Sequence, residues 1–260
     1  MRPPAMTFTP LRRHYRDGIG SRPTRQPMRP ERKPVSTYVL IPGAGGSAWY
    51  WHPVVPLLQA AGHEAIAVDL PADDESAGLP EYARLVAHAI GDRDDVVLAA
   101  MSLGGFTAPM VAAKTPLRAV VLVNAMIPLP GETPDAWWDA TGSQPARIAA
   151  AEAGGYGTEF DLATYFLHDV PPEIAAAGAQ YERNESAAAF ASTCDFDTWP
   201  SIPIGVVAGA GDRFFPVDFQ RRVARDRLGL EADVLPGGHL IALAQPGPLA
   251  RYLLERGSPR

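Results

Sequence analysis

Short apolar runs alternate with helix-like segments along most of the chain. Residues rich in Val, Ile and Leu form six runs, at 37–41, 64–70, 96–100, 117–123, 204–208 and 232–235. Helical patterns lie between or after them, at 48–61, 79–90, 102–114, 216–228 and 241–255. Apolar runs of this length, separated by helices, are typical of parallel strands that are buried on both faces. The pattern predicts an α/β fold, with a mostly parallel six-stranded sheet flanked by helices.

The fourth and fifth apolar runs are separated by a long interval, residues 128–201. A loop of that length without secondary structure is uncommon in a compact domain. We therefore expect helices there, one of them near residues 172–184, forming a cap over the sheet. Aromatic residues are spread through the interval: Trp137, Trp138, Tyr156, Phe160, Tyr165, Phe166, Tyr181 and Phe190. Most should pack the cap's own core, and the candidates for a substrate pocket are Trp137, Trp138, Phe166 and His168.

The first 34 residues differ in composition from the rest. They hold nine Lys or Arg residues against only Asp17 and Glu31, although the whole chain carries a formal charge of −6. A Pro- and Arg-rich segment with little apolar content cannot offset the entropy of ordering, so we expect a disordered basic tail at 1–34 and one folded domain at 35–260. Such a tail could bind nucleic acid or an acidic surface, but it lacks the interleaved aromatic residues of single-strand binders. We predict a small-molecule partner and neither nucleic acid nor membrane, and the oligomeric state stays open.

The cysteine count and the hydropathy pattern indicate in which cellular compartment the protein is expected. Cys194 is the single cysteine, so no intramolecular disulfide can form. No stretch approaches the roughly 18 to 20 apolar residues of a membrane helix, and no apolar run follows the early arginines as in a secretory signal. We expect a cytoplasmic protein. His, Cys and carboxylate residues show no metal-ligand spacing, so no metal is predicted.

The most informative motif lies where the third apolar run ends. Residues 96–106 read VVLAAMSLGGF, a buried strand followed by Ser102 and a helical pattern. A nucleophilic serine on a sharp strand-to-helix turn needs small residues two positions to either side, and Ala100 and Gly104 meet that need. Ser102 could alternatively be an ordinary helix N-cap residue.

A glycine-rich loop follows the first apolar run. Residues 41–49 read IPGAGGSAW. Acyl transfer needs two N–H donors for the oxyanion, one from the residue after the nucleophile and one from this loop, so we name Leu103 and Ala44. The loop could instead bind phosphate, but it has neither the G-x-G-x-x-G spacing nor the P-loop lysine.

Two further turns each end in a side chain that could complete a catalytic triad. Asp212 closes the glycine turn after the fifth apolar run, and His239 closes the one after the sixth. In a parallel sheet these turns meet at the carboxyl edge, where ligand sites form. Asp212 could alternatively form a surface ion pair with Arg213 or Arg221, and His239 could simply cap the last helix. Four suitable turns in the order loop, Ser, Asp, His are together more specific than any one alone.

From Thr37 onward the chain resembles the α/β-hydrolase family, in particular the branch of plant methyl esterases and hydroxynitrile lyases. The residues that carry the resemblance are 43–46 with Trp49, 102–105, 168–169, Asp212 and 238–239. It implies an α/β-hydrolase fold with a helical cap. Pro42 stands where the family usually has histidine. Leu240 stands where the lyases have lysine, which makes hydrolysis the expected reaction.

These observations predict a serine hydrolase of small, hydrophobic carboxylic esters, working through an acyl-enzyme with Ser102 as nucleophile, His239 as base and Asp212 as its partner. No cofactor is required. Lactone or amide cleavage, acyl transfer and carbon–carbon lysis at the same triad remain alternatives, because the fold does not separate them. A ligand-binding module without turnover is the non-catalytic alternative.

Overall fold

A computed structural model describes residues 35–257, which form one compact unit. The predicted basic tail at 1–34 lies outside the described residues. Six strands form a wholly parallel sheet in the order β2-β1-β3-β4-β5-β6. The strands are β1 (Thr37–Ile41), β2 (Glu64–Ala67), β3 (Val96–Met101), β4 (Ala119–Val123), β5 (Ile204–Gly209) and β6 (Asp233–Leu235). The predicted α/β class and six-stranded sheet are confirmed.

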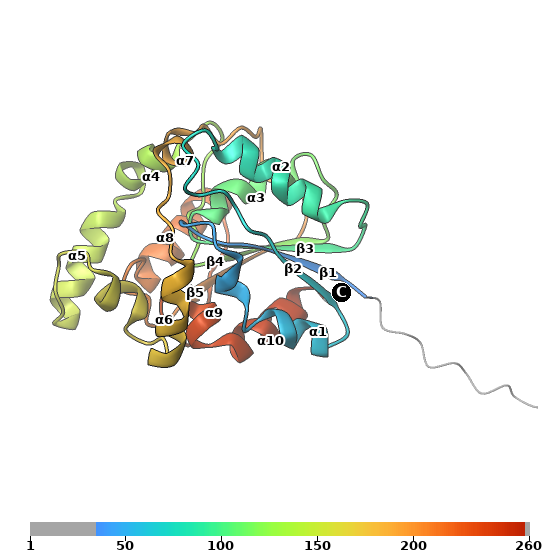
Figure 1. Cartoon of the computed structure of the whole chain (residues 1–260). Helices are drawn as coiled ribbons and strands as arrows, with labels where there is room; N and C mark the ends of the chain where they lie inside the picture. The colour runs from blue at the N-terminus through green and yellow to red at the C-terminus, as the bar shows by residue number, and fades with distance from the viewer. Residues whose placement is uncertain (1–34, 258–260) are drawn as a thin grey trace, which may run out of the picture. The chain divides into compact units, whose positions relative to one another are not determined.

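Helices cover both faces of the sheet, which explains why β1, β3 and β4 are buried at every position (Figure 1). One face packs against α2 (Leu79–Ile90), α3 (Gly104–Ala112) and α8 (Val217–Leu228). The other face packs against α1 (Val55–Ala60), α9 (Ile241–Ala244) and α10 (Pro246–Gly257), and against the 3₁₀ turn η1 (Ala48–Trp51). Two separate apolar cores result.

Two predicted helices are divided in the structure. The segment 48–61 splits into η1 and α1, because Pro53 and Pro56 cannot donate the backbone hydrogen bonds of one continuous helix. The segment 241–255 splits into α9 and α10 around Gln245, next to Pro246. The helix after the third strand begins at Gly104, two residues later than the pattern indicated, because Ser102 occupies the turn.

The interval between β4 and β5 is helical and lies beyond the carboxyl ends of the strands (Figure 1). We call residues 128–201 the cap segment. Its elements are α4 (Pro134–Thr141), α5 (Ser143–Gly154), the π-helical turn η2 (Ala163–Leu167), α6 (Pro172–Gly178), the 3₁₀ turn η3 (Ala179–Tyr181) and α7 (Ala187–Ala191). Thr133 begins the first of them, its hydroxyl accepting the N–H of Ala136. Over residues 35–257, no helix is long and apolar enough to span a bilayer.

Candidate active site

Ser102 lies on a strained turn between β3 and α3. Its φ is 50°, a left-handed conformation that residues other than glycine seldom adopt. The glycines after it permit the turn to pack closely. A Cβ at Gly104 would lie 2.4 Å from the Pro42 carbonyl oxygen, and one at Gly105 would lie 2.1 Å from the Met126 carbonyl oxygen. The turn therefore depends on the absence of a side chain at Gly104, which the motif indicated, and also at Gly105.

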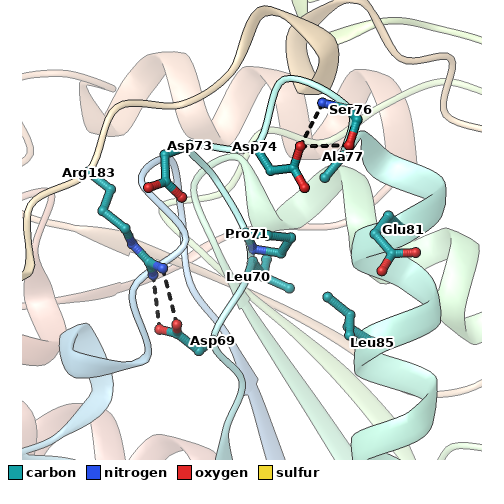
Figure 2. Close-up of a pocket in the computed structure, with 10 residues that line it drawn as sticks. All are labelled: Asp69, Leu70, Pro71, Asp73, Asp74, Ser76, Ala77, Glu81, Leu85 and Arg183. Atoms are coloured by element: carbon teal, nitrogen blue, oxygen red, sulfur yellow. Dashed lines mark hydrogen bonds and ion pairs between the residues drawn. The ribbon is translucent and has the colours of Figure 1, made fainter.

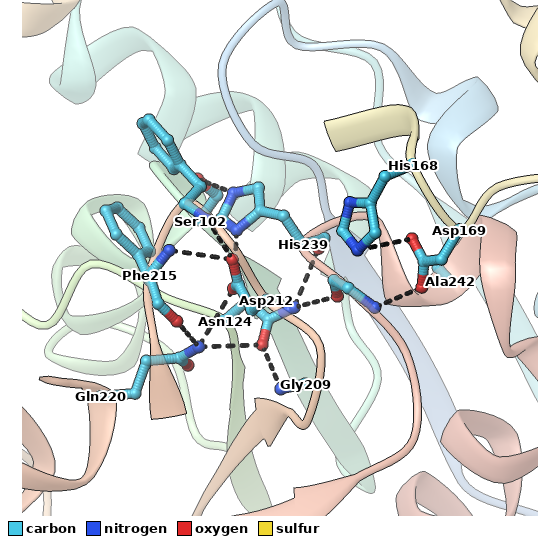
Figure 3. Close-up of polar contacts among 12 residues, drawn as sticks. Ser102, Asn124, His168, Asp169, Gly209, Asp212, Phe215, Gln220, His239 and Ala242 are labelled. Atoms are coloured by element: carbon cyan, nitrogen blue, oxygen red, sulfur yellow. Dashed lines mark hydrogen bonds and ion pairs between the residues drawn. The ribbon is translucent and has the colours of Figure 1, made fainter. Parts of the chain in front are cut away.

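The structure brings together the three side chains that the sequence singled out (Figure 3). His239 Nε2 lies 3.1 Å from Ser102 Oγ, and His239 Nδ1 lies 2.9 Å from Asp212 Oδ2. A carboxylate can only accept, so Nδ1–H donates to Asp212 and Nε2 is left to accept the serine hydroxyl proton. All three residues are buried. This is the geometry that activates a serine hydroxyl.

The carboxylate of Asp212 is held by four donors. Oδ1 accepts the backbone N–H groups of Phe214 at 2.9 Å and Phe215 at 2.8 Å. Oδ2 accepts His239 Nδ1–H and, at 3.0 Å, the side-chain amide of Gln220. A buried carboxylate needs such hydrogen bonds to replace the contacts with water that it loses on folding. Asp212 is therefore fixed as an acceptor toward the imidazole.

The alternative roles considered for Asp212 and Ser102 do not match the geometry. Within the part of the chain described, Asp212 forms no ion pair with Arg213 or Arg221, and Arg213 donates to the Thr164 carbonyl instead. The side chain of Ser102 does not cap α3, whose N-cap is Leu103 without a side-chain hydrogen bond. The structure thus places both side chains at the common centre.

Asn124, at the carboxyl end of β4, is a site residue that the sequence analysis missed. Its Nδ2 donates to the carbonyls of Gly238 at 3.0 Å and His239 at 2.8 Å. Its Oδ1 accepts the Gly209 N–H at 2.7 Å and, at 3.3 Å, the Gln220 amide. The side chain thereby ties the turn that carries the imidazole to the end of β5 (Figure 3). A polar residue ending an apolar run at the carboxyl edge was the available signal.

The glycine-rich loop packs closely against Ser102. We call residues 42–47 the oxyanion loop. A Cβ at Gly43 would lie 2.7 Å from Met101 Sδ and 2.9 Å from Ser102 Cβ. Ala44 and Leu103 both line the cavity beside Ser102, and within residues 35–257 neither backbone N–H donates to a protein acceptor. Two unpaired donors thus lie beside the serine, as an oxyanion hole requires.

A cavity of about 670 Å³ opens over Ser102 and His239. Its wall joins the oxyanion loop to the cap segment, and most of its side chains are apolar. The apolar lining residues include Trp49, Met126, Trp138, Leu162, Phe166, Leu167, Phe190, Phe214, Leu240 and Leu243. A pocket of this size and character suits a small hydrophobic molecule.

Aromatic rings surround the imidazole of His239. The ring of Phe166, from η2 in the cap segment, stacks on it with centroids 4.7 Å apart and an interplanar angle of 16°. Phe214 and Phe215 approach it edge-on, at 5.1 and 5.2 Å. These contacts limit rotation of the ring and exclude water from it.

Tyr50 also lines this cavity. Its oxygen accepts the Ala242 N–H at 3.3 Å, and burial is the main cause that raises its pKa above the ordinary value.

The structure corrects two of the four expected pocket residues. Trp138 and Phe166 line the cavity, but Trp137 does not. Trp137 is fully buried, donates its indole N–H to the Ile127 carbonyl at 3.0 Å and packs on Phe215 in the core. The sequence alone did not distinguish the two neighbouring tryptophans, because their orientation depends on packing against distant residues such as Phe215.

His168 is also outside the cavity lining. His168 packs against the turn that precedes His239. A Cβ at Gly238, in this turn, would lie 2.8 Å from His168 Cε1. The neighbouring Asp169 accepts the Gly238 N–H (Figure 3). The pair therefore supports the backbone of this turn from the cap segment, and His168 is a structural residue rather than a pocket residue.

A second depression lies beside the oxyanion loop, lined by the carboxylates of Asp69, Asp73, Asp74 and Glu81 together with Arg183 (Figure 2). Within residues 35–257, no group of three or more His, Cys, Asp or Glu side chains is arranged to hold a metal ion. Asp69 is instead paired with Arg183, and Asp74 with Ser76.

Comparison with known proteins agrees with this geometry. The model of the alpha/beta hydrolase family matches residues 38–252. Methylesterase 7 of Arabidopsis thaliana is 28% identical over 254 residues, covering 84% of this chain and 95% of the relative. Among solved structures, a pyrethroid hydrolase from Sphingobium faniae JZ-2 superposes with a TM-score of 0.70 at 21% identity, covering 86% of this chain and 98% of that one. Polyneuridine aldehyde esterase superposes with a TM-score of 0.69 at 22% identity, covering 85% and 99%. The structural matches share the fold.

Proposed function

This chain belongs to the α/β-hydrolase family, and we propose that it is a serine hydrolase that cleaves small hydrophobic carboxylic esters. The observation that carries the proposal is the continuous chain of contacts from Ser102 Oγ through His239 to Asp212. Relatives named methylesterase and esterase support ester hydrolysis as the reaction class.

In the first half of the proposed reaction, Ser102 Oγ attacks the ester carbonyl carbon while its proton passes to His239 Nε2. Asp212 stabilises the imidazolium through Nδ1–H. The carbonyl oxygen gains the negative charge and is received by the N–H groups of Ala44 and Leu103. The imidazolium then gives its proton to the leaving alcohol, which departs and leaves an acyl group on Ser102.

In the second half, water attacks the acyl carbon and passes a proton to His239 Nε2. The oxyanion is received at the same two N–H groups. Its collapse breaks the bond to Ser102 Oγ, which takes the proton back from the imidazolium as the carboxylic acid leaves.

Two features of the cavity favour hydrophobic esters. Its walls are mainly apolar, and its volume of about 670 Å³ falls within the usual range of small-molecule sites. Leu240, directly after the imidazole, contributes apolar surface at the place where a cation would stabilise an anionic leaving group. This favours hydrolysis over lysis at the same triad.

The test is turnover of p-nitrophenyl acetate and butyrate by the wild type and by Ser102→Ala. We expect wild-type hydrolysis, and a loss of about 10³-fold or more in kcat for the variant, because removing a triad member leaves only binding and oxyanion stabilisation. The exposed Ser201 provides the matched control, since Ser201→Ala should retain full activity.

Labelling by a fluorophosphonate separates the possible outcomes. A wild-type protein that is labelled at Ser102 but hydrolyses neither ester would have a more specialised substrate. A wild-type protein that is neither labelled nor active would be a binding module, and the proposed function would be wrong.

A further inference from the structure

The oxyanion loop is held by two side chains from the stretch of the cap segment between η3 and α7. Glu185 Oε2 accepts the Gly45 N–H at 2.8 Å, and Arg183 Nε donates to the Gly45 carbonyl at 3.1 Å. The two cap residues thus bind both polar groups of a single glycine, which follows directly after Ala44. Nearly 140 residues of chain separate the partners.

Arg183 and Glu185 are themselves hydrogen-bonded to residues outside the cap segment. Arg183 forms a bidentate ion pair with Asp69, at 2.9 and 3.1 Å (Figure 2). Asp69 also accepts the Ala48 N–H at 2.9 Å, so it holds the far end of the same loop. Glu185 Oε1 accepts the Tyr82 hydroxyl at 2.5 Å. Planar guanidinium-to-carboxylate pairing of this kind fixes direction as well as distance.

The loop also fits closely between the cap segment and the residues after β2. A Cβ at Gly45, whose φ is +85°, would lie 2.9 Å from the Arg183 carbonyl oxygen. A Cβ at Gly46, whose φ is +63°, would lie 2.5 Å from the Leu70 carbonyl oxygen. Glycine at both positions allows the cap backbone and the loop backbone to touch.

The arrangement leaves the N–H of Ala44, a residue that lines the cavity, without an acceptor in the described part of the chain. The peptide after Ala44 is fixed by Glu185 on its N–H, and the next peptide is fixed by Arg183 on its carbonyl. An oxyanion hole stabilises charge only if its donors are already oriented before the reaction. A loop with four consecutive positions of glycine or alanine, residues 43–46, has little side-chain packing of its own to provide that orientation.

We propose that Arg183 and Glu185 are positioning residues, which hold the oxyanion loop so that the Ala44 N–H points at the reacting carbonyl. The cap segment thereby contributes to the chemical step as well as to the pocket wall. This inference rests on the proposed function, because it concerns the same serine reaction. The two residues line the cavity as well as touching the loop, and the role proposed for them acts through the loop.

The test compares Glu185→Ala and Arg183→Ala with the wild type on p-nitrophenyl butyrate. We expect kcat to fall about 10-fold in each, less than the 10²–10³-fold loss on deleting a donor outright, while KM stays within twofold. Binding of a trifluoromethyl ketone, whose adduct with Ser102 carries an oxyanion, should weaken in parallel with kcat. A general loss of folded protein would lower the active fraction without changing the ratio of inhibitor affinity to KM.

Two further variants complete the design. Glu185→Gln keeps an oxygen that can accept the Gly45 N–H and should restore most of kcat. Asp73→Ala removes a carboxylate from the same depression and should match the wild type, since Asp73 makes no hydrogen bond to the loop within the described chain. If Glu185→Ala is too unstable to assay, the kcat and inhibitor affinity of Arg183→Ala alone test the positioning role.

The outcomes distinguish this inference from the proposed function. An active wild type with unchanged kcat in Glu185→Ala and Arg183→Ala would overturn the positioning role and leave the serine hydrolase assignment in place. A wild type that neither turns over esters nor reacts with a fluorophosphonate would overturn both.

Discussion

The two sides of Ser102 are built in different ways. On one side, Asp212 and His239 are tied together by Asn124 and Gln220, and all four side chains are buried within the main domain. We call these four residues the acid–base array. On the other side, the oxyanion loop is held by Arg183 and Glu185 from the cap segment, which are only partly buried. The hydrogen bonds of the first side come mostly from residues outside the cap segment, to which the cap adds the Phe166 ring and the Asp169 carboxylate. The second side is held by cap side chains.

The difference in burial has energetic consequences. A buried hydrogen-bonding group that loses its partner costs about 1–3 kcal/mol, because water cannot replace the bond. A partly exposed ion pair contributes about 0–1 kcal/mol, and water can substitute for either partner. Substitutions in the acid–base array should therefore affect both stability and turnover, whereas those in the cap contacts should affect turnover more than stability.

The largest effect in this comparison is expected from Asp212→Asn. The N–H groups of Phe214 and Phe215 orient the amide oxygen toward themselves, so the new NH₂ faces His239 Nδ1. Nδ1 must then accept, Nε2 carries the proton, and the imidazole can no longer take one from Ser102. We expect kcat to fall about 10³–10⁴-fold, in steady-state ester hydrolysis at pH 7 to 8.

The control for this substitution is Asp218→Asn, in the first turn of α8 away from the imidazole, which should stay within twofold of wild-type kcat. A kcat for Asp212→Asn within tenfold of wild type would show that the orientation of the imidazole does not depend on this carboxylate.

A large stability effect is expected from Asn124→Ala. The change leaves the Gly238 and His239 carbonyls and the Gly209 N–H without their buried partner. It also puts alanine at a φ of 46°, which asparagine tolerates better. We expect the free energy of unfolding in urea to fall by about 3 kcal/mol or more. Asn184→Ala, at an exposed position, should change it by less than about 0.5 kcal/mol, and an equal loss in both variants would contradict the comparison.

The two sides also differ in how far the sequence predicted them. Local features of the sequence predicted the first side: the strand runs, the small residues around Ser102 and the turn after each strand. From these features we predicted the sheet and the meeting of Ser102, Asp212 and His239 at one edge of it. Which tryptophan of the cap faces inward depends on packing against Phe215, which no local pattern records. The contacts of Arg183 and Glu185 with Gly45 join distant segments through two polar side chains, so periodicity carries no trace of them.

The smallest expected effect is a pH dependence on the cap side. Burial is the main cause that raises the pKa of Glu185 above its ordinary value of 4.5, outweighing the hydrogen bonds from Tyr82 and Gly45. The folded protein therefore binds this proton more tightly than the unfolded chain, so its contribution to stability is complete below pH 4.5 and is lost as pH rises through the folded-state pKa. Glu185→Gln cannot titrate. Urea unfolding should show that the free energy of unfolding of the wild type, relative to that of Glu185→Gln, falls between pH 4 and pH 7. The same comparison with Glu182→Gln, at an exposed position, should show no such fall. A flat difference for Glu185→Gln would mean that water reaches the carboxylate freely and that the cap holds the oxyanion loop less closely than the acid–base array is held.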